Sequence, residues 1–293
     1  MIPDNVHGNR RCGDNQGLST MGANQFTQEE SAPVKNVSAY NRQAWDGLVG
    51  RGNQWTVPVS DGQVDAARRG SWEVVLTPLK SVPRDWFGEL AGAKLLCLAG
   101  AGGQQGPILA AAGAAVTVLD NSPAQLAQDE QVARRHALDI RTELGLMQDL
   151  SRFPDGSFDL VFHPVSNCFV QDVLPVWREA FRVLVPGGRM LAGFCNPVLF
   201  GFDPDATGKQ ALTWKYRLPY TDSGSRSPQD LERHMASGEP LEFSHSLEDQ
   251  IGGQLDAGFV LRQLYEDTAS DWELAEYFPP FIATLALKPV GTL

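Results

Sequence analysis

The sequence lacks the features by which a protein binds a polyanion, spans a membrane or holds a structural metal ion. It contains 24 Lys and Arg residues and 35 Asp and Glu residues, which gives a formal net charge of −11. Its longest basic runs are pairs. This balance predicts neither a nucleic acid nor an anionic membrane as a partner. No apolar run approaches the roughly 18 residues of a membrane-spanning helix. The four cysteines lack the paired spacing of metal ligands, so we also predict no metal site.

The surroundings of the cysteines and the composition of the N-terminus indicate in which cellular compartment the protein is expected. Cys97, Cys168 and Cys195 lie in apolar, strand-like surroundings, where a buried reduced thiol is the simplest interpretation. The N-terminus has no charged segment followed by an apolar run, which is the pattern of a secretion signal. Both features are typical of a cytoplasmic protein.

Composition divides the chain into three parts. Residues 1–36 are rich in Asn, Gln, Gly, Ser and Thr without periodic apolar residues, and we predict them to be disordered. Residues 37–90 begin with an amphipathic pattern and continue with an aromatic-rich stretch, which predicts a helical cap. Residues 91–293 are predicted to form the main domain. Four residues share one side of the first predicted helix: Tyr40, Ala44, Trp45 and Leu48.

From residue 91 onward, strand and helix patterns alternate, as a parallel sheet covered on both faces requires. The turn Pro186-Gly187-Gly188 is predicted to stop a helix over 172–184, and a further helix is predicted over 246–257. The pattern therefore predicts an α/β fold with a seven-stranded mixed sheet, helices on both faces and an insertion at 197–243 after the fifth strand. The predicted strands are 94–98, 115–119, 140–144, 158–162, 189–195, 259–265 and 281–287.

A glycine-rich turn and an acidic residue outline a nucleotide-binding βαβ unit. The cluster 99–106 follows one strand-like run, and Asp120 closes the next. In such a unit the turn lets the backbone approach a ligand closely, and the acid binds a ribose diol. Small residues at this turn also serve helix–sheet packing, so the turn alone leaves both interpretations open. Because Asn121-Ser122-Pro123 then caps a helix, we expect the carboxylate to face a crevice and the ligand to contain adenosine.

In order and spacing, four segments resemble the class I S-adenosylmethionine-dependent methyltransferases. They are the turn at 99–106, Asp120, residues 155–161 entering the fourth strand and residues 182–188 entering the fifth. The resemblance covers about residues 91–200 and, more loosely, 38–293. It implies a Rossmann-like fold, S-adenosylmethionine as cofactor and methyl transfer as activity.

The resemblance also implies which residues bind the cofactor. The turn would lie against its methionine part, Asp120 on the ribose hydroxyls, residues 146–149 beside the adenine and residues 163–166 beside the methyl group. The predicted cofactor-binding residues are Tyr40, Ala99, Gly100, Ala101, Gly102, Gly103, Asp120, Asn121, Met147, Gln148, Asp149, Leu150, His163 and Ser166.

At three places the sequence departs from the family's pattern. Cys97 stands where many members have an acid, and Ala99 and Ala101 replace two common glycines. Leu146 stands where an acid often meets the adenine amino group, which leaves Asp149 as the substitute. These departures predict weaker cofactor binding, or contacts to the amine through water and Tyr40.

Methyl transfer requires neither a metal nor a covalent nucleophile, because the sulfonium already activates the methyl group. A general base is needed only when the acceptor must lose a proton, and His163 is the predicted candidate. A loop histidine without a role in the reaction, or a residue that contacts the cofactor only through its backbone carbonyl, is at least as good an interpretation. Predicted acceptor-binding residues are Asn167, Asn196, Trp214, Tyr216, Tyr220 and His245, although the aromatic ones fit core packing, and His245 a position beside a helix cap, as well.

The acceptor is expected to be a small molecule. The dipeptides His163-Pro164 and Asn196-Pro197 each end a strand, but neither continues as the Asn-Pro-Pro-aromatic motif of nucleic-acid methyltransferases. Two other functions remain open. A catalytically idle protein of this fold would bind the cofactor or a partner, and a nicotinamide-dependent oxidoreductase would use a similar turn, although the sequence has no Tyr-x-x-x-Lys pair. The sequence leaves the acceptor, the methylated atom and the oligomeric state undetermined.

Overall fold

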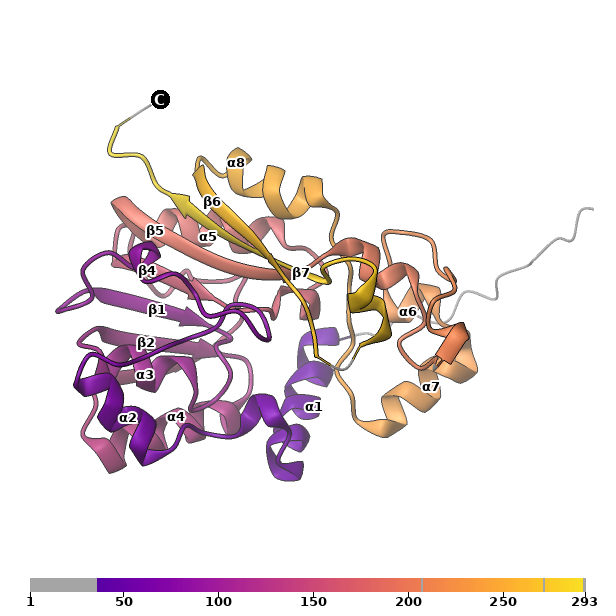
Figure 1. Ribbon diagram of the computed structural model, residues 1–293, viewed down its shortest axis with the longest axis horizontal. Coiled ribbons are helices and arrows are strands. Elements are labelled where there is room, and N and C mark those ends of the chain that lie inside the picture. Colours follow the sequence, from indigo (N-terminus) through magenta and orange to yellow (C-terminus); the bar gives the residue numbers. More distant parts are fainter. Residues whose placement is uncertain (1–35, 207, 271, 292–293) are drawn as a thin grey trace, which may run out of the picture. The chain divides into compact units, whose positions relative to one another are not determined.

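Seven strands form one mixed sheet in the computed structural model, which describes residues 36–206, 208–270 and 272–291. The strand order is β3-β2-β1-β4-β5-β7-β6, and β7 runs antiparallel to both of its neighbours (Figure 1). This arrangement confirms the predicted α/β, Rossmann-like fold. The prediction of disorder for residues 1–36 falls almost entirely outside the described residues. The strands are β1 (Lys94–Leu98), β2 (Ala115–Asp120), β3 (Ile140–Leu144), β4 (Phe158–His163), β5 (Leu184–Cys195), β6 (Val260–Asp267) and β7 (Phe281–Leu287).

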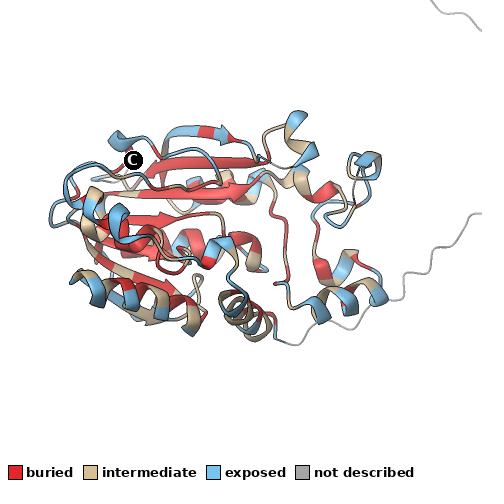
Figure 2. Ribbon diagram, turned by 60° about the horizontal axis from the view of Figure 1, so that its bottom comes forward, coloured by how far each residue is buried: buried red, intermediate tan, exposed pale blue. Residues whose placement is uncertain are grey.

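Helices cover both faces of the sheet because successive side chains of a strand point to opposite sides. Leu95 and Cys97 of β1 pack in one apolar cluster with residues of α3 and α4, whereas Leu96 and Leu98 pack in another with α5. The central strands are therefore buried on both faces, as Figure 2 shows. The helices are α1 (Val37–Arg51), α2 (Asp61–Arg68), α3 (Gln105–Ala111), α4 (Pro123–His136), α5 (Leu174–Val183), α6 (Asp222–Ser225), α7 (Pro228–Ser237) and α8 (Gly253–Asp256).

The fifth strand begins earlier than predicted. It starts at Leu184, directly after α5 ends, instead of at Arg189. Leu184 pairs with Phe158 of β4, and the register then shifts before Leu160. The Pro-Gly-Gly turn therefore lies within an irregular strand instead of stopping a helix, because the ladder tolerates a proline where the pairing is interrupted.

The predicted helix over 246–257 is also irregular. A π-helical turn at Glu248–Gly252 precedes the four residues of α8. A Cβ atom on Gly253 would come within 2.6 Å of the Leu174 side chain. Close packing against α5 therefore requires a glycine here, and glycines weaken a regular helix.

Only part of residues 37–90 is helical, which corrects the expectation of a helical cap. After α1 and α2, residues 72–90 are irregular apart from a short 3-10 turn, and their buried side chains, such as Leu76 and Trp86, join the cluster on one sheet face. Aromatic residues suit this cover because each buries a large apolar area. The buried side of α1 also differs from the predicted one, since it carries Asn41 with Val37, Ala44 and Leu48, whereas Trp45 is partly exposed.

None of the described helices is long and apolar enough to cross a membrane. Within the same residues, no group of three or more His, Cys, Asp or Glu side chains is placed to hold a metal ion. Cys97, Cys168 and Cys195 are buried free thiols, as predicted.

Candidate active site

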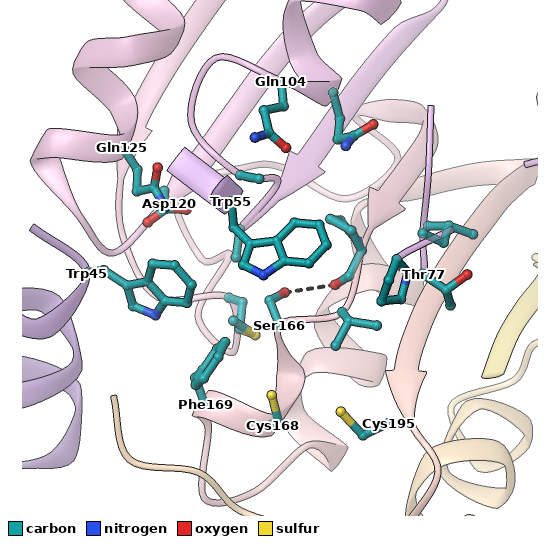
Figure 3. Close-up of a pocket in the computed structure, with 18 of the residues that line it drawn as sticks. Trp45, Trp55, Thr77, Gln104, Asp120, Gln125, Ser166, Cys168, Phe169 and Cys195 are labelled. Atoms are coloured by element: carbon teal, nitrogen blue, oxygen red, sulfur yellow. Dashed lines mark hydrogen bonds between the residues drawn. The ribbon is translucent and has the colours of Figure 1, made fainter. Parts of the chain in front are cut away.

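A cavity of about 440 Å³ opens where β1, β2 and β4 end, at the edge of the sheet where ligands of open α/β folds bind (Figure 3). Its walls come from α1, the turn after β1, the end of β2 and the segments that follow β3 and β4. The predicted cofactor residues that line it are Ala99, Ala101, Asp120, Asn121, Met147, Gln148 and Ser166, and Leu146 lines it with them.

The turn after β1 is tightly held. Ala99 and Ala101 both have positive φ angles, 47° and 61°, and both line the cavity. Gly102 donates its backbone N–H to Gln125 Oε1 at 2.9 Å, and a Cβ atom there would lie 2.4 Å from that oxygen. Gly100, Gly102 and Gly103 are not among the lining residues. These glycines therefore serve the close packing of the turn, while the two alanines form its surface.

Asp120 carries the carboxylate of the site. It ends β2, and its Oδ1 accepts the backbone N–H of Ser122 at 2.8 Å. Burial raises the pKa of Asp120 to about 6, against the opposing effect of the backbone N–H groups of Ser122 and Asn121. A carboxylate that is partly stripped of water gains most from new hydrogen-bond donors.

The N-terminal helix is fastened over this carboxylate. Asn121 donates to the backbone oxygen of Ser38 at 2.8 Å, and Asp46 accepts the Ser122 hydroxyl at 2.5 Å. Ser38, Asn41 and Trp45 of α1 consequently line the cavity. Tyr40 does not, because its hydroxyl lies within 3.1 Å of the backbone oxygen of Met235 and its ring packs on an apolar cluster with α7.

The segment after β3 contributes one unsatisfied polar atom. Gln148 lines the cavity, and its Oε1 atom is buried without a hydrogen-bond partner among the described residues. Asp149 and Leu150 lie outside the lining: the Asp149 carboxylate accepts the Ser151 N–H at 3.1 Å, and Leu150 is fully buried. Buried acceptors without a donor are uncommon in folded proteins, so Gln148 Oε1 is an exception in the wall of this cavity.

His163 lies beneath the cavity and does not line it. Its side chain is completely buried, its Nδ1 lies 3.1 Å from the Leu98 backbone oxygen, and its ring packs edge-on against Trp177. Burial lowers the pKa of His163 to about 4. Ser166, in contrast, lines the cavity while its hydroxyl donates to the Pro164 oxygen at 2.9 Å.

The structure separates the predicted acceptor-binding residues. Asn167, Asn196 and His245 make hydrogen bonds within the protein, to Gln250, to the Pro279 oxygen and to the Asn167 oxygen respectively, and none of them lines the cavity. Trp214 is 53% exposed and packs on Phe202. Tyr216 and Tyr220 line a second cavity, which adjoins the first.

This second cavity has a volume of about 940 Å³ and lies largely within the 197–243 insertion. Apart from Trp45, which was expected on the first helix near the cofactor, sequence reasoning missed the residues that line both cavities, because no motif marks them and they come from distant segments. These residues are Trp45, Trp55, Phe169, Glu242 and Trp272. Burial raises the pKa of Glu242 to about 7, and the nearby Asp222 carboxylate acts in the same direction.

Comparisons with known proteins agree with this geometry. Residues 96–192 match a family model described as a methyltransferase domain. The chain is 49% identical over 255 residues to the uncharacterized methyltransferase YbaJ of Bacillus subtilis strain 168, across 85% of this chain and 98% of the relative.

The solved structures that share the fold include the following two. An S-adenosylmethionine-dependent methyltransferase from Mesorhizobium loti superposes with a TM-score of 0.53 at 19% identity, over 70% of this chain and 94% of that chain. The cyclase SpnF gives a TM-score of 0.53 at 16% identity, over 89% and 100% of the two chains. One fold thus serves different chemistry, and activity has to be argued from the site.

Proposed function

Because the chain belongs to the class I S-adenosylmethionine-dependent methyltransferases, we propose that it transfers the methyl group of this cofactor to a small-molecule acceptor. The observation that carries the proposal is that Asp120 and Gln148 line the same cavity, and that the buried Oε1 atom of Gln148 has no hydrogen-bond partner among the described residues. A ribose diol supplies two hydroxyl donors and an adenine supplies an amino donor, so the two residues fit an adenosine group.

The cofactor would occupy the cavity along these two residues. Asp120 would accept hydrogen bonds from the ribose, Gln148 from the adenine amino group, and the backbone at Ala99 and Ala101 would lie against the methionine part. Gln148 thereby takes the role that the sequence had suggested for Asp149. The bound cofactor supplies a methyl group already activated by its sulfonium.

The chain's own contribution is alignment and the exclusion of water. Trp45, Trp55 and Phe169 surround the junction of the two cavities, and their apolar rings leave few partners for water there. In methyl transfer the leaving group needs no acid, so the main gain in rate comes from aligning the acceptor with the methyl group and removing water from it. We assign the acceptor to the second cavity because five residues line both cavities.

A labelled-methyl assay tests this function. The protein is mixed with cofactor carrying a deuterated methyl group and a metabolite extract of Bacillus subtilis, the organism of the 49% identical relative. We expect one small molecule to gain the labelled methyl group in amounts equal to the demethylated cofactor formed. Cofactor binding without any labelled product would favour the idle protein, and preferential binding of NADH would contradict the cofactor assignment.

Replacing His163 by alanine tests whether its imidazole takes part in the reaction. We expect the affinity for S-adenosylmethionine and the methyl-transfer rate to stay within several-fold of wild type, because the His163 ring lies outside the lining of the cofactor cavity. Stability should fall by about 1–3 kcal/mol, since the substitution leaves a gap beside Trp177. Calorimetry, initial rates and urea unfolding measure the three quantities. A hundredfold loss of rate with normal affinity would instead identify His163 as the general base.

A further inference from the structure

The wall of the second cavity combines apolar and charged side chains. Aromatic side chains from α1, the insertion and the segment before β7 form much of its wall, and polar side chains of α6 and α7 also line it. Lys215 already lies 4.7 Å from the centre of the Tyr216 ring, so this wall stabilises a cation over an aromatic face. The aromatic residues are Trp45, Trp55, Phe169, Phe200, Phe202, Tyr216, Tyr220 and Trp272.

The basic side chains in this lining are already neutralised by acids. Lys215 pairs with Asp203 at 2.6 Å, and Arg226 pairs with both Asp222 and Asp205. Arg233 pairs with Asp230. An anionic ligand would therefore find no unpaired Lys or Arg among the described lining residues, and a cationic ligand is favoured.

Glu242 lines both cavities and differs from the paired acids described above. Its carboxylate has no hydrogen-bond or ion-pair partner among the described residues, whereas its backbone N–H donates to Asp222 Oδ2 at 2.6 Å. Its neighbours Leu241 and Phe243 are buried in the apolar cluster with α7. Because side chains alternate along extended backbone, Glu242 is directed to the opposite side, into the cavities.

The position of Glu242 is fixed by α1. Asn41 accepts the Leu241 N–H at 2.8 Å and donates to the Leu241 oxygen at 3.0 Å and to the Phe169 oxygen at 3.1 Å. Asn41 is 3% exposed, so these bonds are shielded from water. The carboxylate thus projects from a backbone that has little freedom to move away from the cofactor cavity.

Neighbouring charged groups and burial together set the pKa of the Glu242 carboxyl group. Asp222 and Glu239 repel its negative charge, while Arg226 attracts it, and the Cys168 thiol lies close enough for Glu242 to raise the pKa of that thiol. With burial, the balance raises the pKa of Glu242 to about 7. The group can therefore accept and release a proton at neutral pH.

We propose that the methyl acceptor is an amine with an apolar or aromatic body, which enters through the second cavity and gives its proton to Glu242. This inference rests on the function proposed above. The ammonium group loses one proton to the carboxylate and becomes a neutral amine. Its lone pair then forms the bond to the methyl carbon, the carbon–sulfur bond breaks, and its electron pair returns to sulfur. The products are a methylated ammonium ion and the demethylated cofactor.

The labelled-methyl assay on the Bacillus subtilis extract is repeated with Glu242→Gln, and each labelled product is tested for retention on a cation exchanger and identified by mass spectrometry. We expect a retained amine as the product. With that amine purified, Glu242→Gln should lower kcat/KM at least tenfold, and Glu242→Asp should recover part of the loss. Thermal unfolding should show one cooperative transition in both variants, which establishes that they fold.

Glu232→Gln is the matched control, because Glu232 is an exposed carboxylate of α7 outside both linings. It should leave kcat/KM unchanged. A labelled product without a basic nitrogen would overturn the assignment of the acceptor, and unchanged kcat/KM in Glu242→Gln would overturn the role of Glu242. No labelled product at all, with cofactor bound, would contradict methyl transfer itself and this inference with it.

Discussion

Asp120→Asn should weaken S-adenosylmethionine binding about ten- to a hundredfold. A hydrogen bond to a charged group contributes roughly 1.5–3 kcal/mol, and asparagine keeps the shape of the side chain while removing its charge. The amide also presents an NH2 group where the ribose hydroxyls need acceptors. The Asp120 carboxylate lies at the cavity, and its hydrogen bonds come from backbone donors of its own turn.

Calorimetric titration with cofactor measures this loss, and Asp149→Asn is the matched control. Asp149 is an acid on the adenine-side segment that lies outside the lining, so its substitution should change affinity less than threefold. Equal losses in both variants would show that general charge, instead of a contact with Asp120, controls binding.

The pH dependence of binding provides an internal check on the same residue. Because the pKa of Asp120 is about 6 in the free protein, the carboxylate must lose a proton before it binds the ribose below that pH. Affinity should therefore be constant above pH 7 and fall as the pH drops through 6, approaching about tenfold per pH unit. This dependence should disappear in Asp120→Asn.

Asp222→Ala should lower the free energy of unfolding by about 3–5 kcal/mol, the usual cost of breaking a buried ion pair. The side chains of Asp222 and Arg226 are 2% and 4% exposed and lie 2.5 Å apart. Asp222 also accepts the Tyr220 hydroxyl at 2.6 Å and the Glu242 N–H. The alanine variant leaves these donors unpaired in a buried place, which costs more than the lost contact alone.

Urea unfolding of Asp222→Ala and Asp205→Ala measures the effect. Asp205 binds the same guanidinium from the surface, with a side chain that is 70% exposed, and its loss should cost less than about 1 kcal/mol. Adding Arg226→Met to Asp222→Ala should restore part of the stability because it removes the uncompensated charge. A loss below 1 kcal/mol for Asp222→Ala would mean that the buried pair does not hold the insertion together.

The sheet and its cofactor edge could be predicted because their signals are local. Strand periodicity, the turn after β1 and Asp120 each lie within a few residues, and their order identified the family. The start of β5 was missed because a proline and two glycines argue against a strand wherever neighbouring strands are unknown.

The acceptor side could not be predicted, since it depends on contacts between distant segments. Asn41 bonds to Leu241 across 200 residues, and no pattern near either residue indicates the pairing. Glu242 lies in an irregular stretch whose composition is ordinary. His163 and His245 were predicted as site residues from the chemistry of their side chains alone. In the structure both are buried and lie outside the cavities, whereas Glu242 lines both cavities.

The left-handed conformation of Ala99 and Ala101 has a consequence for the energetics of cofactor capture. Glycine populates this region freely, whereas alanine enters it at a cost and leaves it only by rearranging the turn. The packing of Gly102 on Gln125 already holds the backbone of the turn in place. The free-energy cost of the left-handed alanines is therefore incurred when the protein folds and not when the cofactor binds. The cofactor therefore meets a rigid surface and loses little affinity to the ordering of the loop.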